Sequence, residues 1–309
     1  MTPCILSIFN TNKPIITIGI TVFNEGEFLS EAWDSVLNQA GLRWDSVMVL
    51  DGGGDKKTRK IFDSIQHPTL TKYSFSENQG TYICRTKAIE LTETEWYFHL
   101  DADDLLPSNA IDLVLNHIKE NPKAEFIGGA CKHFGQGQDQ IRYPATDPEC
   151  LSTSPFFYAQ SPIKKKLFRE IGEYYLPNHF FHADWDFWLS VYEKKIIGVL
   201  TDEVLYNRRR RNDSITWKNI DGLEKGLELI INRHSHYFTQ NDREKKARFN
   251  LYQNLARQYR TLGRRKAAAF YGRKAMNYGE SIPVFSSIIH EEKMSILRYF
   301  IRRLARIIN

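Results

Sequence analysis

The chain has 309 residues and a mass of 36.1 kDa, with 42% hydrophobic and 26% charged residues, a composition that excludes disordered, collagen-like and low-complexity proteins. The net charge of +5 is unevenly spread, because residues 216–309 carry 19 Lys and Arg against 8 Asp and Glu, which leaves residues 1–215 at −6. The four cysteines lack metal-ligand spacing and indicate neither a zinc site nor a disulfide framework.

Strands and helices alternate in the first hundred residues. Apolar and β-branched runs predict buried strands, whereas apolar residues three and four positions apart predict helices. The predicted elements in chain order are strand 15–23, helix 28–37, strand 46–50, strand 70–75, helix 81–91 and strand 96–100. This alternation predicts an α/β fold with a mostly parallel sheet and helices on both faces.

Acidic residues fall at the carboxyl ends of two predicted strands, where ligands bind in open α/β sheets. Asp51 ends the second strand and is followed by Gly52–Gly54, a run typical of a tight turn. Asp55 is expected to cap the next helix. Asp101 directly follows the strand at 96–100 and opens the cluster Asp-Ala-Asp-Asp.

This acidic cluster can be interpreted in two ways. Asp101 and Asp103 are expected to project to the same side, so their carboxylates can converge on Mg²⁺ or Mn²⁺ carrying a diphosphate. Alternatively, the carboxylates simply favour the N-terminus of the following helix.

The second half of the chain changes character. The pattern is irregular after residue 125, resumes as a helix over 184–195, and is almost wholly helical from residue 222. Residues 251–279 are predicted to form two helices broken at Gly263. We therefore expect two domains, an α/β domain at 1–216 and a helical basic region at 217–309.

Further motifs accompany the acidic cluster. They are TVFNE (21–25), SVLNQ (35–39), LDGGGD (50–55), ENQGTYICRTKA (77–88) and LDADD (100–104). In this order and spacing they resemble the family 2 glycosyltransferases of the GT-A fold. The segments PIKKKLFREIGEYYLP (162–177) and HADWDFWLSV (182–191) are similar to later motifs of that family, and the resemblance covers about residues 14–216.

The resemblance implies roles for individual residues. Thr21, Phe23 and Glu25 would line the nucleobase pocket, and Asp51 would accept a hydrogen bond from the base. Asp101 would hold the ribose or the ring, with its neighbour Ala102 also in the donor site, and Asp103 would ligate the metal on the diphosphate.

Two arginines complete the predicted donor site. The Arg85 guanidinium suits a second phosphate or base contact, since it can donate two parallel hydrogen bonds. Arg211 stands where the family usually has His, so the loop 208–211 would clamp phosphate by charge alone. A solvated surface loop and a nuclear-localisation patch are the alternatives for this arginine run.

The resemblance also implies a general base. Inverting transfer needs a carboxylate that takes a proton from the acceptor hydroxyl, and Asp184 keeps the acidic position of that motif. Helix capping is its alternative role. Asp186 competes for the assignment, followed by His182.

The C-terminal segment 291–309 has the pattern of a basic amphipathic helix, which can lie on an anionic membrane or dock with its charges solvated. No nucleic-acid motif accompanies this charge. No apolar stretch reaches the roughly 18 residues of a spanning helix, and residues 1–10 lack a signal-peptide pattern. We expect a cytoplasmic protein, with any membrane contact peripheral and on the inner face.

Together these features predict a metal-dependent inverting glycosyltransferase. The donor would be a nucleotide-diphosphate sugar, most simply a UDP-sugar with a hexosyl or related group. The acceptor would be a glycan or glycolipid hydroxyl in surface polysaccharide or lipopolysaccharide synthesis, with Mn²⁺ or Mg²⁺ as cofactor. The alternatives are a non-catalytic nucleotide-sugar-binding or scaffold protein, and a nucleotidyltransferase of related fold.

Overall fold

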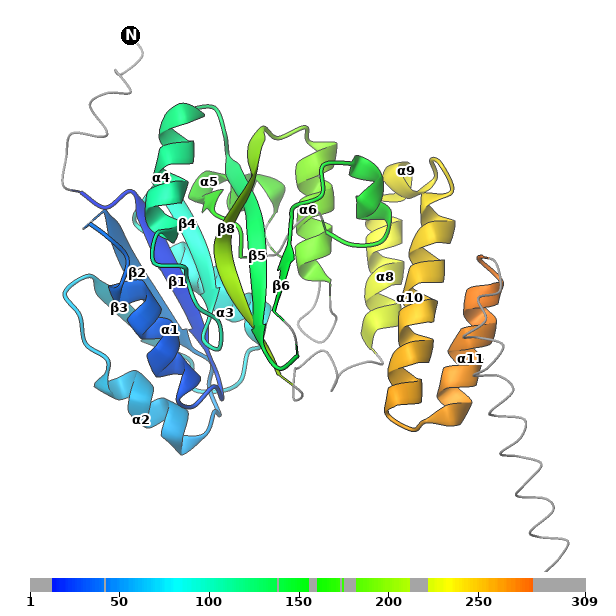
Figure 1. Cartoon of the computed structure of the whole chain (residues 1–309), viewed down its shortest axis with the longest axis horizontal. Helices are drawn as coiled ribbons and strands as arrows, with labels where there is room; N and C mark the ends of the chain where they lie inside the picture. The colour runs from blue at the N-terminus through cyan, green and yellow to red at the C-terminus, as the bar shows by residue number, and fades with distance from the viewer. Residues whose placement is uncertain are drawn as a thin grey trace, which may run out of the picture. The chain divides into compact units, whose positions relative to one another are not determined.

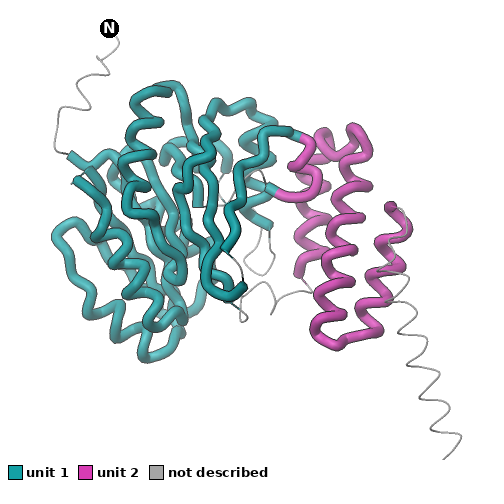
Figure 2. Tube along the Cα trace, in the orientation of Figure 1, with its two compact units in different colours: residues 1–148, 155–214 teal, residues 149–154, 215–309 magenta. Residues whose placement is uncertain are grey.

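The computed structural model describes residues 13–41, 43–137, 139–155, 160–172, 174, 182–211 and 222–279. The chain forms two compact units, residues 1–148 with 155–214 and residues 149–154 with 215–309 (Figure 2). The expected domain division at residue 216 stays a prediction. The predicted helix at 291–309 lies outside the described residues.

The first unit is an α/β structure built on one mixed sheet (Figure 1). Its strands are β1 (Ile16–Val22), β2 (Trp44–Leu50), β3 (Leu70–Ser74), β4 (Trp96–Asp101), β5 (Phe126–Gly135), β6 (Gln140–Arg142), β7 (Ile163–Lys164) and β8 (Gly198–Arg210). Its helices are α1 (Phe28–Leu37), α2 (Lys56–Ser64), α3 (Thr81–Leu91), α4 (Ala110–Glu120), α5 (Lys165–Ile171) and α6 (Ala183–Glu193). The predicted fold class is therefore confirmed.

The strand order is β3-β2-β1-β4-β7-β5-β6, with β8 paired to β5. The pairs β1–β2, β1–β4, β2–β3 and β5–β8 are parallel, whereas β7 and β6 run antiparallel to their neighbours. The chain leaves β1 toward β2 and β3, and then returns to place β4 on the other side of β1. This reversal creates a switch point beyond the carboxyl ends of β1 and β4, the position at which ligands bind in open α/β sheets.

The sheet is covered on both faces. Every residue of β1 is buried, as expected for a central parallel strand. Alternate β1 residues, such as Ile18 and Ile20, join apolar side chains of α1 and α4 in one core cluster. Helix α3 contacts β1 and β2 and lies on the other face in Figure 1. Gly19 faces this second side, where an added Cβ would lie 2.2 Å from the Tyr97 ring.

The second unit is helical. It contains α8 (Gly222–Arg233), α9 (Ser235–Phe238), α10 (Arg243–Thr261) and α11 (Arg265–Met276). The predicted break at Gly263 separates α10 from α11, and its φ of 70° explains the glycine. A 3-10 turn at Pro148–Ser152 supplies Glu149, which pairs with Arg243 at 2.6 Å and Lys246 at 3.2 Å. These pairs explain why residues 149–154 belong to this unit.

Candidate functional site

The sheet brings the predicted motifs together at the carboxyl ends of β1, β2 and β4. Thr21 is the register partner of Asp101, and Val22 is the partner of Leu50. The pairing continues past the strand ends, since the Ala102 N–H donates to the Thr21 carbonyl at 3.3 Å. The segments at 21–25, 50–55 and 100–104 are therefore neighbours in space.

Glu25 turns back toward the end of β1. Its Oε2 accepts the Phe23 N–H at 2.6 Å. Burial raises the pKa of Glu25 to about 7, and the charges of Asp103 and Asp101 add to that rise. Glu25 therefore lies within electrostatic reach of the acidic cluster, as a group that changes protonation near neutral pH.

Asp51 is buried and holds the loop before α3. Its Oδ1 accepts the Gln79 N–H at 2.6 Å, and its Oδ2 accepts the Gly80 N–H at 2.9 Å. The following glycines allow this close approach, because an added Cβ on Gly52 would lie 2.3 Å from the backbone of Glu77. Asp55 caps α2, as predicted, by accepting the Thr58 N–H at 2.8 Å.

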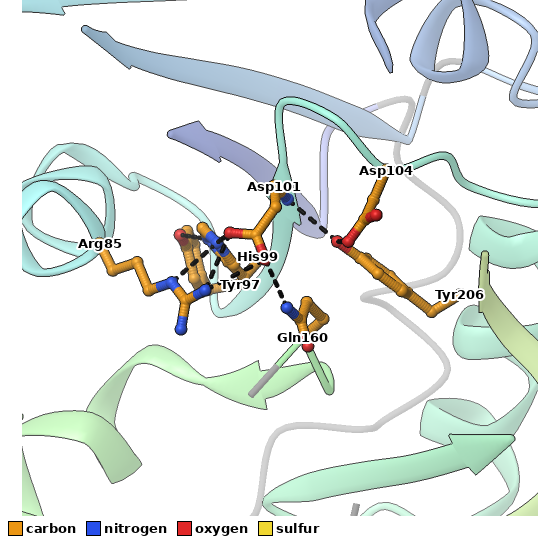
Figure 3. A network of polar contacts seen from close by, with 7 residues as sticks. All are labelled: Arg85, Tyr97, His99, Asp101, Asp104, Gln160 and Tyr206. Carbon is orange, nitrogen blue, oxygen red and sulfur yellow. Dashed lines mark hydrogen bonds and ion pairs between the residues drawn. The ribbon is translucent and has the colours of Figure 1, made fainter. Parts of the chain in front are cut away.

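Asp101 lies at the centre of a buried polar network (Figure 3). The Arg85 Nη2 donates to both of its carboxylate oxygens, at 2.8 and 3.1 Å. The Gln160 Nε2 donates to Oδ2 at 2.5 Å. Burial favours the protonated form, yet the Arg85 guanidinium holds the pKa of Asp101 well below its usual value. Asp101 is thus an ionised carboxylate with both oxygens engaged.

His99 lies beside this ion pair. Its Nε2 is 3.0 Å from the Arg85 Nε and 2.8 Å from the Asp101 Oδ1, and its Nδ1 is 3.0 Å from the Tyr97 hydroxyl. Burial and the Arg85 charge lower the pKa of His99 to about 4. The ring is therefore neutral near pH 7, and its tautomer decides whether Nε2 accepts from Arg85 or donates to Asp101.

Asp104 connects the acidic loop to β8. The Tyr206 hydroxyl donates to its Oδ2 at 2.9 Å, and the Arg209 N–H donates to its Oδ1 at 2.6 Å. The same hydroxyl accepts the Asp101 N–H at 3.0 Å (Figure 3). Tyr206 and Asp104 are both buried, so the Asp104 carboxylate serves to hold the acidic loop against β8.

Asp103 has a different environment. The Arg211 Nη1 lies 3.1 Å from its Oδ2, and the side chains are 24% and 30% exposed, respectively. Asp101 pairs with Arg85 and Asp103 with Arg211, so the two carboxylates have different protein partners. Their expected convergence on a metal ion that carries a diphosphate stays a prediction. Arg209 supports the loop by donating to the Asp103 carbonyl at 2.8 Å.

The arginine run was expected to form a loop, but Arg208–Arg210 extend β8, which pairs with β5 as far as Gly135. The side chains of Arg209 and Arg210 each donate to an acceptor on another element of the unit. The Arg209 Nη2 donates to Glu31 at 2.7 Å, and its guanidinium covers the Phe28 ring at 4.4 Å. Strand pairing and these contacts bring Arg211 to the acidic loop.

The residues around Asp103 fit a divalent cation of the Mg²⁺ type. Such ions take oxygen ligands and are usually held by one or two carboxylates together with waters and substrate phosphates. Asp103 supplies one partly exposed carboxylate. Within the described ranges no group of three or more His, Cys, Asp or Glu forms a protein cage for a metal. One partly exposed carboxylate fits an ion whose other ligands are waters and substrate phosphates.

Asp184 lies in the first turn of α6. Its Oδ1 accepts the Trp185 N–H at 2.9 Å. The preceding Ala183 N–H donates to the Tyr82 hydroxyl at 3.3 Å, and Tyr82 lies 5.8 Å below the Arg85 guanidinium. Burial raises the pKa of Tyr82, and the charge of Asp184 adds to that rise. Tyr82 thus contacts both the start of α6, through Ala183, and Arg85.

Several residues of this network had no signal as site residues in the sequence. Tyr97, His99 and Asp101 are two positions apart on one strand, so strand alternation could have placed them on one face. Gln160 and Tyr206 come from segments 59 and 105 positions away from Asp101, where no motif indicated them.

An open α/β sheet with polar side chains gathered at its switch point is typical of α/β proteins that bind a ligand beyond the carboxyl ends of their strands. Within that class, the sequence model described as "Glycosyl transferase family 2" matches residues 17–188. The chain belongs to this family, as the sequence motifs predicted. The matched residues include the motifs at 50–55 and 100–104 and the start of α6.

The chain is similar to TuaG of Bacillus subtilis, named for teichuronic acid biosynthesis, with 24% identity over 67% of this chain and 84% of TuaG. It is also similar to WcaA of Escherichia coli, named for colanic acid biosynthesis, with 25% identity over 51% of this chain and 53% of WcaA. A further relative, MJ1057 of Methanocaldococcus jannaschii, is 23% identical over 58% of this chain. The match spans 64% of the length of MJ1057, so that protein extends beyond it.

Solved structures share the fold. The structure of Staphylococcus aureus TarS 1–349 in complex with UDP-GlcNAc has a TM-score of 0.61 at 13% identity, covering 91% of this chain and 92% of that one. The mannosyltransferase PcManGT of Pyrobaculum calidifontis, in complex with GDP-Man and Mn²⁺, has a TM-score of 0.52 at 15% identity, covering 92% and 81%. These likenesses confirm the fold of a glycosyltransferase of the GT-A type.

Proposed function

We propose that the chain transfers a sugar, with inversion, from a UDP-sugar to a hydroxyl group of a glycan or glycolipid. The observation that carries this proposal is the convergence of 21–25, 50–55 and 100–104 at the carboxyl ends of three adjacent parallel strands. The TarS complex with UDP-GlcNAc supports a UDP-sugar as donor.

The donor site is proposed to lie over β1, β2 and β4. Thr21, Phe23 and Glu25 would contact the nucleobase, and Asp51 would accept its ring N–H in exchange for one of its backbone donors. A neutral Glu25 can donate a hydrogen bond as well as accept one, which suits a base edge that carries both kinds of group.

The ribose and phosphates are proposed to lie along the acidic loop. Asp101 and Ala102 would face the ribose, and Arg85 would orient Asp101, since its Nη2 binds both carboxylate oxygens. Arg211 would contact the diphosphate, because guanidinium groups bind phosphate in bidentate fashion.

Asp103 would hold Mn²⁺ or Mg²⁺ together with the diphosphate. When bound, the ion supplies positive charge that stabilises the departing phosphates. The PcManGT complex with GDP-Man and Mn²⁺ supports a divalent ion for this fold.

Asp184 is proposed to be the general base. The acceptor oxygen forms a bond to the anomeric carbon, its proton passes to the Asp184 carboxylate, and the bond from that carbon to the diphosphate breaks. Asp184 is partly exposed, whereas Asp186 is fully buried within α6. Burial lowers the pKa of His182, so that ring would be a weak base near pH 7. The surroundings therefore favour Asp184.

The acceptor is proposed to be a surface polysaccharide or lipopolysaccharide precursor, as the names of TuaG and WcaA support. No described helix is both long and apolar enough to cross a membrane. Peripheral attachment to the inner face through 291–309 stays a proposal that rests on the sequence.

The experiment that tests this function measures UDP release from a panel of UDP-sugars, with and without glycan acceptors. We expect one donor to be consumed in an acceptor-dependent reaction by the wild type. Asp184→Asn should bind the donor with unchanged affinity and lose turnover by about 10²-fold or more. Glu193→Gln, at the exposed end of the same helix, is the matched control and should keep full turnover. Full turnover by Asp184→Asn would contradict the assignment of the base.

A further inference from the structure

We propose that Arg211 is an exchangeable counter-ion. In the free protein it forms an ion pair with the Asp103 carboxylate, and when metal and nucleotide bind it pairs with the diphosphate instead. This inference rests on the proposed function, and it adds a regulatory property to the site. Arg211 would suppress binding of the free metal ion and make metal binding depend on the nucleotide.

The three carboxylates of the acidic loop differ in how firmly they are held. Asp101 has partners from α3, β4 and the segment at Gln160, and Asp104 has partners on β8. Within the described part of the chain, Arg211 is the one other residue that donates a hydrogen bond to the Asp103 side chain. Asp103 is therefore the carboxylate of this loop that an incoming cation can reach at the loss of a single ion pair.

The position of Arg211 suits exchange. It follows Arg210, the last residue of β8, so the ladder with β5 no longer fixes its backbone. Its guanidinium lies 4.9 Å from the Phe28 ring, and its side chain is 24% exposed, whereas the Arg85 side chain is 9% exposed. A planar guanidinium on a long side chain can keep its contact with the ring while its donors change partners.

Metal and Arg211 compete for the same carboxylate in the free protein, since two cations close to Asp103 also repel each other. A diphosphate changes this balance, because it offers the guanidinium a bidentate partner and offers the metal further oxygen ligands. Metal and nucleotide then bind with positive coupling, and linkage requires each to raise the affinity of the other by the same factor.

Electron paramagnetic resonance of free Mn²⁺ tests this inference in the full chain, because the signal of the hydrated ion is lost on binding. Without nucleotide, Arg211→Gln should bind Mn²⁺ roughly fivefold more tightly than the wild type, the scale of one partly exposed ion pair. With saturating Mn²⁺, the same variant should bind UDP about tenfold more weakly, since a charged hydrogen bond is lost. These opposite directions separate exchange from a general structural defect.

Control variants make the outcome specific. Arg169→Gln is the matched control, because Arg169 is an exposed arginine in the last turn of α5, outside the acidic loop and β8, and its replacement should leave both affinities unchanged. Asp103→Asn in the Arg211→Gln background should remove the gained Mn²⁺ affinity. Arg211→Lys, which keeps the charge without the planar fork, should give intermediate values and guards against misfolding of the first variant.

The failures are distinguishable. Unchanged or weaker Mn²⁺ binding by Arg211→Gln, in a protein that still binds UDP with Mn²⁺, would overturn the counter-ion role alone. A wild type that binds no UDP in the presence of Mn²⁺ would overturn the proposed function and this inference together.

Discussion

Neighbouring carboxylates of the acidic loop have different surroundings and therefore different chemistry. Asp101 is ionised beside Arg85, Asp104 is enclosed by Tyr206 and the Arg209 backbone, and Asp103 is partly exposed. The sequence predicted that Asp101 and Asp103 belong to the site, because they follow a buried strand. It could not predict their partners, since these come from segments with no motif.

Glu25 provides a test at the residue scale. Its folded-state pKa of about 7 exceeds its ordinary value of 4.5, so the folded protein holds this proton over pH 4.5–7 more firmly than the unfolded chain. The protonated Glu25 therefore stabilises the folded protein fully below pH 4.5. As the pH rises to 7, the free energy of unfolding falls by up to about 3 kcal/mol.

Glu25→Gln removes this titration. We expect its free energy of unfolding, measured by urea denaturation from pH 4.5 to 7.5, to rise relative to the wild type as the pH increases. Glu27→Gln is the control, because Glu27 is exposed and pairs with Lys57 at 2.8 Å. A difference between Glu25→Gln and wild type that stays constant with pH would contradict the raised pKa.

At the scale of elements, the alternation of strands and helices through β4 followed from apolar periodicity, and its boundaries agree with the prediction to within a few residues. The β5–β8 pair was harder to predict from the sequence, because β8 ends in arginines, which are typical of a solvated loop. Arg209, for example, is accommodated by Glu31, by Asp104 and by two aromatic rings that only the folded chain brings near.

Tyr206 connects two elements, the end of β4 and β8, through one hydroxyl group. Tyr206→Phe leaves the Asp101 N–H and the Asp104 carboxylate each short of a partner in a buried site. We expect the free energy of unfolding in urea to fall by about 1–3 kcal/mol. Tyr143→Phe, at a site that is 55% exposed, should change it by less than about 0.5 kcal/mol. Equal effects of the two variants would contradict the role assigned to this hydroxyl.

At the scale of the whole molecule, the charge is divided between an acidic portion that contains the site and a basic C-terminal portion. The change in composition indicated this division near residue 216. It did not indicate that residues 149–154 join the helical unit, because that depends on the pairing of Glu149 with Arg243 and Lys246, which lie about a hundred positions away.

Vesicle binding tests the proposed role of the basic segment. The full chain should co-sediment with vesicles that contain phosphatidylglycerol and not with pure phosphatidylcholine, and salt should release it. Replacing Arg302, Arg303 and Arg306 with Gln should weaken this binding, since each basic side chain near such a surface contributes about 1 kcal/mol. Binding that is indifferent to lipid charge would contradict the electrostatic contact.

The central claim is that the acidic loop binds a nucleotide diphosphate through a divalent ion at Asp103. Isothermal titration of the full chain with UDP, with and without Mn²⁺, measures this most directly. The account predicts binding that requires Mn²⁺ and is abolished by Asp103→Ala. Absence of UDP and GDP binding with Mn²⁺ present, or UDP binding that Asp103→Ala leaves intact, would contradict it.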